Sequence, residues 1–186
     1  MKGIAKGLIA VGLGLAIFAK PASAQKPGVE FGFTMVGLNL NNPDGSGNNS
    51  TNFGFGNGNV SAAWYLNEMI ALEPTIVYLY TKNEGASNAN SALGLQLAVP
   101  IYLSKGWGKA GGLFVAPFLG VNRLSAGGVS ASQAHFGANV GTKMKISDNV
   151  FWRVQAGLDL GQDKASVGYP KYSDINVGFG LNVYLH

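Results

Sequence analysis

The last stretch of the chain, residues 174–186, alternates between apolar residues and polar or small ones without interruption. Successive side chains of a β-strand point to opposite faces, so every second residue of such a stretch shares one environment. One face would carry only apolar side chains, namely Ile175, Val177, Phe179, Leu181, Val183 and Leu185. A strand at the end of a chain must pair along both edges or leave backbone N–H and C=O groups unpaired. The stretch therefore predicts the closing strand of a β-barrel.

The amino terminus predicts export from the cytoplasm. Two lysines precede an apolar and glycine run over residues 8–19, and Ala22-Ser23-Ala24 has the small-x-small form of a cleavage site. A membrane-spanning helix is the alternative, but it needs about 20 apolar residues, and Lys20-Pro21 interrupts the run. We therefore predict a cleaved signal peptide over residues 1–24 and one β-barrel domain over residues 25–186.

Charge and cysteine content narrow the class of protein. Lys2, Lys6 and Lys20 belong to the predicted signal peptide, so ten of the 13 basic residues remain in the mature chain against nine acidic ones. This near balance gives no indication of nucleic-acid binding. The chain has no cysteine, so no disulfide stabilises the exported domain. Charged residues make up 12% of the chain, whereas a soluble domain has about 25%.

Eight stretches of the mature chain have the composition and alternation of extended strands. They are residues 29–40, 53–65, 70–81, 93–102, 113–122, 134–146, 150–160 and 174–186. Between Phe55 and Val60 the phase of the apolar residues changes, which predicts a bulge there or a loop that extends to Phe55. Pro117 predicts a bend or a missing ladder bond in its stretch.

Long polar connections alternate with short turns along the chain. The long ones are rich in Asn, Gly and Ser and cover residues 41–52, 82–91, 123–133 and 162–173. This is the layout of a bacterial outer-membrane barrel, with long loops outside the cell and short turns and both termini in the periplasm. Four aromatic residues near the short turns predict an interfacial girdle, with ordinary strand aromatics as the alternative. They are Trp64, Tyr65, Trp107 and Trp152.

The polar faces of the predicted strands distinguish a membrane barrel from a soluble one, such as a secreted lipocalin. In a soluble barrel the polar face meets water and should carry many lysines and glutamates. Here it carries mostly Gly, Ala, Asn, Thr and Gln, which are small enough to fill a narrow lumen. We therefore predict an all-β, eight-stranded, antiparallel up-and-down transmembrane β-barrel with its apolar face toward lipid.

The signal peptide and the eight strands resemble the small outer-membrane β-barrel family that includes the OmpA transmembrane domain and porin-like relatives. Two stretches share in this resemblance: WYLNEMIALEPT (residues 64–75) and the terminal GFGLNVYL (residues 178–185). The resemblance implies a location in the bacterial outer membrane, among its lipid and lipopolysaccharide, and insertion by the outer-membrane assembly machinery. Gly180, Val183 and Leu185 keep the spacing of the family's insertion signal. The chain ends on His186, where that signal usually has an aromatic residue.

Four charged residues have the parity of the lumen face and lie about four residues from the periplasmic end of their strands. They are Glu30, Glu73, Lys143 and Arg153. Isolated charges in a narrow lumen are costly, so we predict that they form ion pairs that plug the periplasmic half. Arg153 would pair with Glu73 or with Glu30, while Lys145 lies nearer the exit. Four independently hydrated side chains in a water-filled lumen are the alternative.

Other polar residues with lumen parity are Gln96, His135, Asn139, Gln155 and Asp159. Outer-membrane lipid A deacylases of similar size use a histidine with a nearby serine on one strand, but here Gly137 stands where the nucleophile would be. We therefore expect no enzymatic activity, no cofactor and no metal, and we interpret His135 as a polar lumen residue.

Two functions fit a barrel of this kind. A structural or surface-interaction protein would act through its four extracellular loops and have a lumen plugged by polar side chains. A small porin-like channel would conduct ions or small solutes through a wet lumen. Eight strands leave an interior barely wide enough for side chains, which favours the first function. The sequence does not indicate which partner the loops would bind.

Overall fold

The computed structural model describes residues 28–43, 50–55, 59–81, 90–103, 112–126, 129–161 and 172–185. Within these ranges the protein is all-β, and the strands pair only in antiparallel fashion. The strands are β1 (Val29–Pro43), β2 (Ser50–Phe55), β3 (Val60–Tyr65), β4 (Ala71–Thr81), β5 (Asn90–Ala98), β6 (Ile101–Tyr102), β7 (Gly112–Ala126), β8 (Val129–Ser147), β9 (Val150–Gly161) and β10 (Tyr172–Leu185). The predicted signal peptide, residues 1–24, lies outside the described residues.

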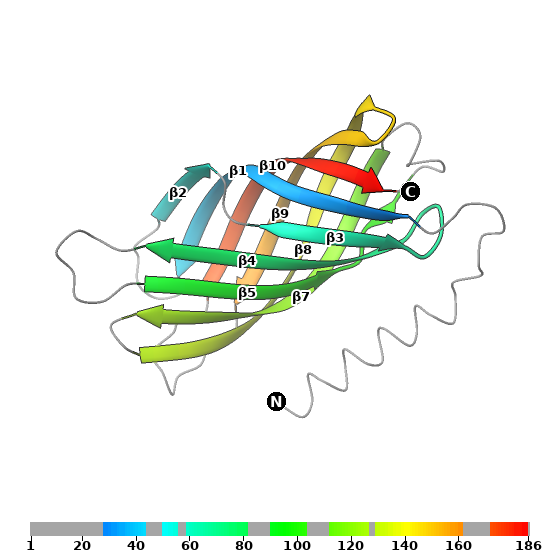
Figure 1. The fold of residues 1–186 in the computed structure, drawn as a ribbon. Helices are drawn as coiled ribbons and strands as arrows, with labels where there is room; N and C mark the ends of the chain where they lie inside the picture. The colour runs from blue at the N-terminus through cyan, green and yellow to red at the C-terminus, as the bar shows by residue number, and fades with distance from the viewer. Residues whose placement is uncertain are drawn as a thin grey trace.

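The described strands occupy eight positions around a closed barrel (Figure 1). β2 and β3 pair with the same edge of β1, and β5 and β6 both pair with β7. The other edge of β1 pairs with β10 from Val29 opposite Leu185 to Pro43 opposite Tyr172. The predicted eight-stranded up-and-down barrel is therefore confirmed, and its closing strand begins two residues earlier than predicted.

Alternation along the strands turns the apolar residues outward, as predicted. Leu95, Leu113 and Val140 are each more than half exposed on the outer face. Their neighbours in sequence on β7 and β8, Phe114 and Asn139, are buried inside the barrel. An apolar outer surface of this kind is suited to lipid, because hydrocarbon offers no hydrogen-bond partners to polar side chains.

One irregularity lies where the apolar phase of the sequence changes. The register of β1 against β10 shifts between Thr34 and Val36, and β2 and β3 are separated on the other edge of β1. The Thr34 N–H donates to the carbonyl oxygen of Asn59 at 3.2 Å next to this break. Phe55 is the last residue of a strand, so the alternative that the loop extends to it is wrong.

A second irregularity lies opposite Pro117, but on the neighbouring strand. β7 is continuous through Pro117, whereas β5 ends at Ala98 and β6 begins at Ile101. Pro100 stands in this gap and has no N–H to donate, while the Val99 N–H donates to the Pro117 carbonyl oxygen at 2.9 Å. The interruption therefore divides β5 from β6, whereas the bend predicted at Pro117 does not break β7.

The predicted loop over residues 123–133 is wrong. β7 continues to Ala126 and β8 begins at Val129, with the Ser125 and Ser130 hydroxyls 2.7 Å apart. Backbone pairing needs no particular side chain, so Ser, Ala and Gly residues extend the ladder where a partner strand is present. β8 has 19 residues, which is more than the roughly 9–11 that a strand needs to cross a bilayer.

The other three predicted loops are also too long at their ends. Strands continue to Pro43 and resume at Ser50, Asn90 and Tyr172, inside the predicted ranges 41–52, 82–91 and 162–173. The remaining parts of these loops lie outside the described residues. Among the residues that the structure describes, no helix is long and apolar enough to span a membrane.

Candidate functional site

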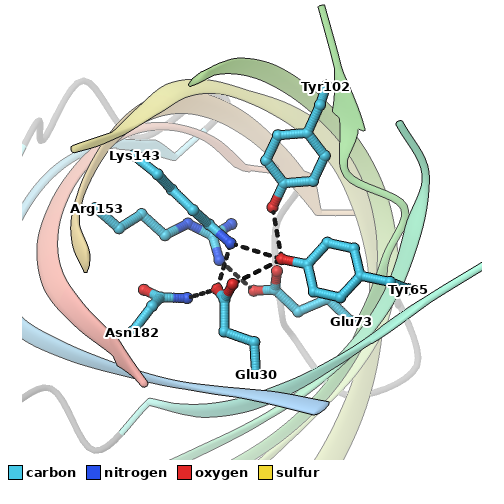
Figure 2. Close-up of polar contacts among 7 residues, drawn as sticks. All are labelled: Glu30, Tyr65, Glu73, Tyr102, Lys143, Arg153 and Asn182. Carbon is cyan, nitrogen blue, oxygen red and sulfur yellow. Dashed lines mark hydrogen bonds and ion pairs between the residues drawn. The ribbon is translucent and has the colours of Figure 1, made fainter. Parts of the chain in front are cut away.

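The four predicted lumen charges meet inside the barrel at the end where β1 begins and β10 ends. Glu30 comes from β1, Glu73 from β4, Lys143 from β8 and Arg153 from β9 (Figure 2). Their exposed fractions are 1%, 4%, 3% and 8%. Each lies on the inner face because its neighbours in sequence are outward residues of the same strand.

Two ion pairs connect these charges across the lumen. Arg153 Nη1 donates to Glu73 Oε1 at 2.6 Å, and Lys143 Nζ donates to Glu30 Oε1. Lys143 and Arg153 stand directly opposite each other on β8 and β9, an arrangement of like charges that is unfavourable alone. The two acids neutralise this cationic pair from other strands. Of the two partners considered for Arg153, the structure places Glu73 in direct contact.

Hydrogen bonds from Tyr65 and Asn182 complete the site. The Tyr65 hydroxyl donates to Glu30 Oε2 at 2.7 Å and accepts from Lys143 Nζ at 3.0 Å. Asn182 Nδ2 donates to Glu30 Oε1, and the Tyr65 and Tyr102 hydroxyls are 3.2 Å apart. Both carboxylate oxygens of Glu30 therefore have partners, which a buried charge requires.

Tyr65 was predicted to lie in the interfacial girdle, and this prediction is wrong. Tyr65 points into the lumen, whereas its neighbour Trp64 is exposed on the outer face. Trp152 also lies on the outer face, stacked on Phe179 with ring centroids 4.7 Å apart. Trp107 lies outside the described residues. Alternation distinguishes Tyr65 from Trp64, since adjacent residues of a strand cannot share a face.

Sequence analysis missed Tyr65, Tyr102 and Asn182 as members of this site. Each follows an outward apolar residue, so alternation alone places all three in the lumen. Tyrosine and asparagine carry no charge, whereas the cost of isolated charges in the lumen points only to charged residues. The signal that identifies all three is a polar side chain with inward parity at the level of the four charges.

Aromatic rings fill the lumen beside the ion pairs. Tyr102, Phe114 and Phe151 are almost fully buried, and Tyr102 and Phe114 pack with small residues that make room for them. The buried small residues are Ala63, Ala71 and Ala116. The Arg153 guanidinium carbon lies 4.7 Å from the centre of the Phe114 ring, and Lys143 Nζ lies 5.1 Å from that of Tyr102. Such contacts stabilise cations in places where water is excluded. The group that fills the lumen is therefore aromatic as well as polar, and we refer to these rings and ion pairs as the plug.

Lys145 lies outside the plug, at the end of the barrel. Its Nζ donates to Asp148 Oδ1 at 2.7 Å in the turn between β8 and β9. This hydrogen bond and the positive charge hold the pKa of Asp148 below its ordinary value. The pair is exposed to solvent, so it contributes little to stability.

Beyond the plug, toward the other end of the barrel, is a cavity of about 690 Å³. All five of the other predicted lumen residues line it: Gln96, His135, Asn139, Gln155 and Asp159. His135 Nδ1 lies 3.0 Å from each carboxylate oxygen of Asp159. Glu73, Arg153 and Asn182 of the site described above also face this cavity.

Among the described residues that line the cavity, His135 has no hydroxyl partner. His135 Nε2 has no hydrogen-bond partner there, so no hydroxyl is positioned as a nucleophile with this histidine as its base. In the same ranges, no three His, Cys, Asp or Glu residues are grouped closely enough to hold a metal ion. Gly137 lies on β8, where a Cβ would meet the backbone carbonyl of Leu158.

Two solved structures illustrate what this chain is similar to. Neisserial surface protein A is 13% identical, and the alignment covers 84% of this chain and 95% of that one with a TM-score of 0.58. The outer membrane protein OprG from Pseudomonas aeruginosa is 10% identical, with 88% and 98% covered and a TM-score of 0.53. No family model matches the chain, and no curated protein matches its sequence. At these identities the likeness is one of fold, and it agrees with the family resemblance found in the sequence.

Proposed function

Because the chain has the fold of the small bacterial outer-membrane β-barrels, we propose that it is an integral outer-membrane protein that acts at the cell surface through its loops and has a closed lumen. The plug is the observation that supports a closed lumen. Two ion pairs and three buried rings, Tyr102, Phe114 and Phe151, occupy the same end of an eight-stranded barrel. The interior of an eight-stranded barrel has little more volume than such side chains occupy.

A permeating ion would have to separate the ion pairs or displace a ring. Breaking a buried ion pair by removing one partner costs about 3–5 kcal/mol, because the other charge is left without compensation. The charges of the plug sum to zero, so it carries no net charge to draw ions of either sign. Steady conduction is therefore unfavourable in this arrangement.

We assign the plugged end to the periplasm. β1 begins there, β10 ends there, and β8 and β9 are joined there by the turn Asp148-Asn149. The connections after β1, β4, β7 and β9 all leave from the opposite end, which we assign to the cell surface. The outer face would contact membrane lipid and lipopolysaccharide, and the assembly machinery would insert the barrel.

A small channel is the second candidate, and the cavity of about 690 Å³ favours it, because it already occupies part of the lumen. Conductance of the refolded protein in planar bilayers distinguishes the two functions. We expect the wild type to be silent and Glu73→Ala/Arg153→Ala to conduct, since this variant removes one pair without leaving a charge behind.

The matched control for this experiment is Lys145→Ala/Asp148→Ala, which removes the exposed ion pair and leaves the plug intact. We expect this control to be as silent as the wild type, with circular dichroism showing that all three proteins are folded. Steady wild-type conductance equal to that of Glu73→Ala/Arg153→Ala would favour the channel instead.

A further inference from the structure

The cavity beyond the plug is a cup with a polar wall. Glu73, Arg153 and Asn182 line it on the side of the plug. Figure 2 shows Glu73 and Arg153 as one ion pair, with Asn182 hydrogen-bonded to Glu30 of the other. Its side wall carries many carboxamides. Those that line it are Asn39, Asn59, Gln96, Asn122, Asn139, Gln155 and Asn176.

Each charged group of the wall already has at least one partner. Glu73 pairs with Arg153, and Asp159 contacts His135 Nδ1 through both of its oxygens. Asp174 accepts a hydrogen bond from Asn39 Nδ2 at 3.2 Å. An ionic guest would have to compete with these contacts and pay for its own desolvation, so the cup is poorly suited to ions.

Several buried polar atoms, on residues that line the cup, have no hydrogen-bond partner among the described residues. Four are carboxamide oxygens, and three belong to ionisable side chains: Asn39 Oδ1, Asn59 Oδ1, Asn139 Oδ1, Gln155 Oε1, Glu73 Oε2, His135 Nε2 and Arg153 Nε. Asn139, His135, Glu73 and Arg153 are all more than nine-tenths buried. Each of these atoms has almost no surface open to the cavity, and buried polar groups normally have hydrogen-bond partners, so these side chains could satisfy a polar guest by turning toward the cavity.

The unpartnered atoms include both donors and acceptors. Arg153 Nε can only donate and Glu73 Oε2 accepts, while a carboxamide offers a donor and an acceptor whichever way it is turned. A hydroxyl group also donates and accepts, so it can satisfy either kind of atom. The ring of Phe118 lines the same cavity and provides an apolar surface for C–H groups.

We propose that this cup binds a neutral, hydroxyl-rich solute the size of a monosaccharide or disaccharide. The volume of about 690 Å³ lies within the range of about 300–1,000 Å³ for small-molecule sites. This inference goes beyond the proposed function, since a barrel with a closed plug can hold such a solute from its open side.

Nuclear magnetic resonance of the folded protein tests the proposal. The ¹⁵N-labelled chain is placed in dodecylphosphocholine micelles, because detergents with sugar headgroups would themselves compete. Glycerol, glucose and sucrose are titrated, with sodium glutamate and arginine hydrochloride as ionic probes. We expect saturable shifts of the Asn139 and Gln155 side-chain amides with glucose or sucrose, and none with the ionic probes.

Two variants test whether the carboxamides bind the solute. Asn139→Leu and Gln155→Leu should each weaken binding roughly tenfold, since each removes hydrogen bonds to the guest at similar volume. Asn149→Leu, an identical change in the turn between β8 and β9, should leave binding unchanged. If Asn139→Leu fails to fold, the affinity of Gln155→Leu for the solute tests the proposal by itself.

Three outcomes would overturn the proposal. No saturable shift with any probe would mean that the cup holds water alone. Tighter binding of an ionic probe would reject the neutral solute. Unchanged affinity in Gln155→Leu would place the binding elsewhere on the protein. Conductance is a separate measurement, so failure here leaves the closed lumen untouched.

Discussion

Arg153 Nη1 lies 2.6 Å from Glu73 Oε1, although their strands, β9 and β4, are separated by three strand positions in either direction around the barrel. The contact therefore spans the lumen and ties together strands that share no backbone hydrogen bonds. Lys143 and Glu30 do the same for β8 and β1. The stability of this barrel should depend on these cross-lumen contacts as well as on its ladders.

Energetic coupling should follow the contacts. We expect Glu73→Ala to lower the free energy of unfolding by about 3–5 kcal/mol, because Arg153 is left as a buried, unpaired charge. Combined with Arg153→Ala, it should show a coupling of about 1–3 kcal/mol in urea unfolding from lipid vesicles. The cycle of Glu30→Ala with Arg153→Ala should give a smaller coupling, since Lys143 contacts Glu30. Strict additivity in both cycles would contradict the ion-paired plug.

The Tyr65 hydroxyl should stabilise the barrel although Tyr65 carries no charge. Tyr65→Phe removes the donor to Glu30 Oε2 and should cost about 1–3 kcal/mol, because a buried carboxylate oxygen loses its partner. Tyr78→Phe is the matched control on the outer face, where the side chain is 54% exposed, and should change stability by less than about 0.5 kcal/mol. Equal urea midpoints for both variants would show that the hydroxyl contributes nothing.

The outer face of the closing strand should tolerate no charge. Phe179→Arg should destabilise the folded protein in vesicles by about 2–4 kcal/mol, because a guanidinium would face hydrocarbon. Phe179→Leu is the control, since it keeps an apolar side chain and loses only the stack on Trp152, worth about 1 kcal/mol. A Phe179→Arg variant with the wild-type urea midpoint would place this face away from lipid.

Two glycines of β10 should respond differently to alanine. A Cβ at Gly180 would collide with the carbonyl oxygen of Phe33, next to the register shift of β1. Backbone atoms cannot move aside easily, so Gly180→Ala should cost about 1–3 kcal/mol. A Cβ at Gly178 would come no closer than 3.5 Å to Gln155, an ordinary contact, so Gly178→Ala should be tolerated. Similar losses in thermal stability for both variants would contradict this explanation.

Accessibility from outside the cell should differ between the two ends of β8. A cysteine at Ser130, beside the β7–β8 connection, should react with an impermeant maleimide on intact cells. A cysteine at Asn149 should react only after the outer membrane is permeabilised. We expect Ser46, Ser87 and Ser166 to behave like Ser130, and Ser104 to behave like Asn149. The opposite pattern would invert the topology.

Alternation in the sequence was sufficient to predict the barrel, its eight strand positions and the direction of most side chains. The reason is local, because a strand places adjacent residues on opposite faces whatever its neighbours are. The same rule put Glu30, Glu73, Lys143 and Arg153 in the lumen. It applies equally to Tyr65, which the prediction had grouped with outward aromatics by residue type.

Strand ends and contact partners were decided only by the tertiary structure. Backbone hydrogen bonds do not depend on side chains, so a ladder ends where its partner ends. β7 and β8 therefore stay paired from Arg123 opposite Ser132 to Ala126 opposite Val129, in spite of the loop-like composition of this part of the chain. Which acid meets which base depends on the order of strands around the barrel and on their relative shift, and both are set by pairing between distant segments. Glu73 and Arg153, 80 residues apart in sequence, come into contact only when the barrel closes.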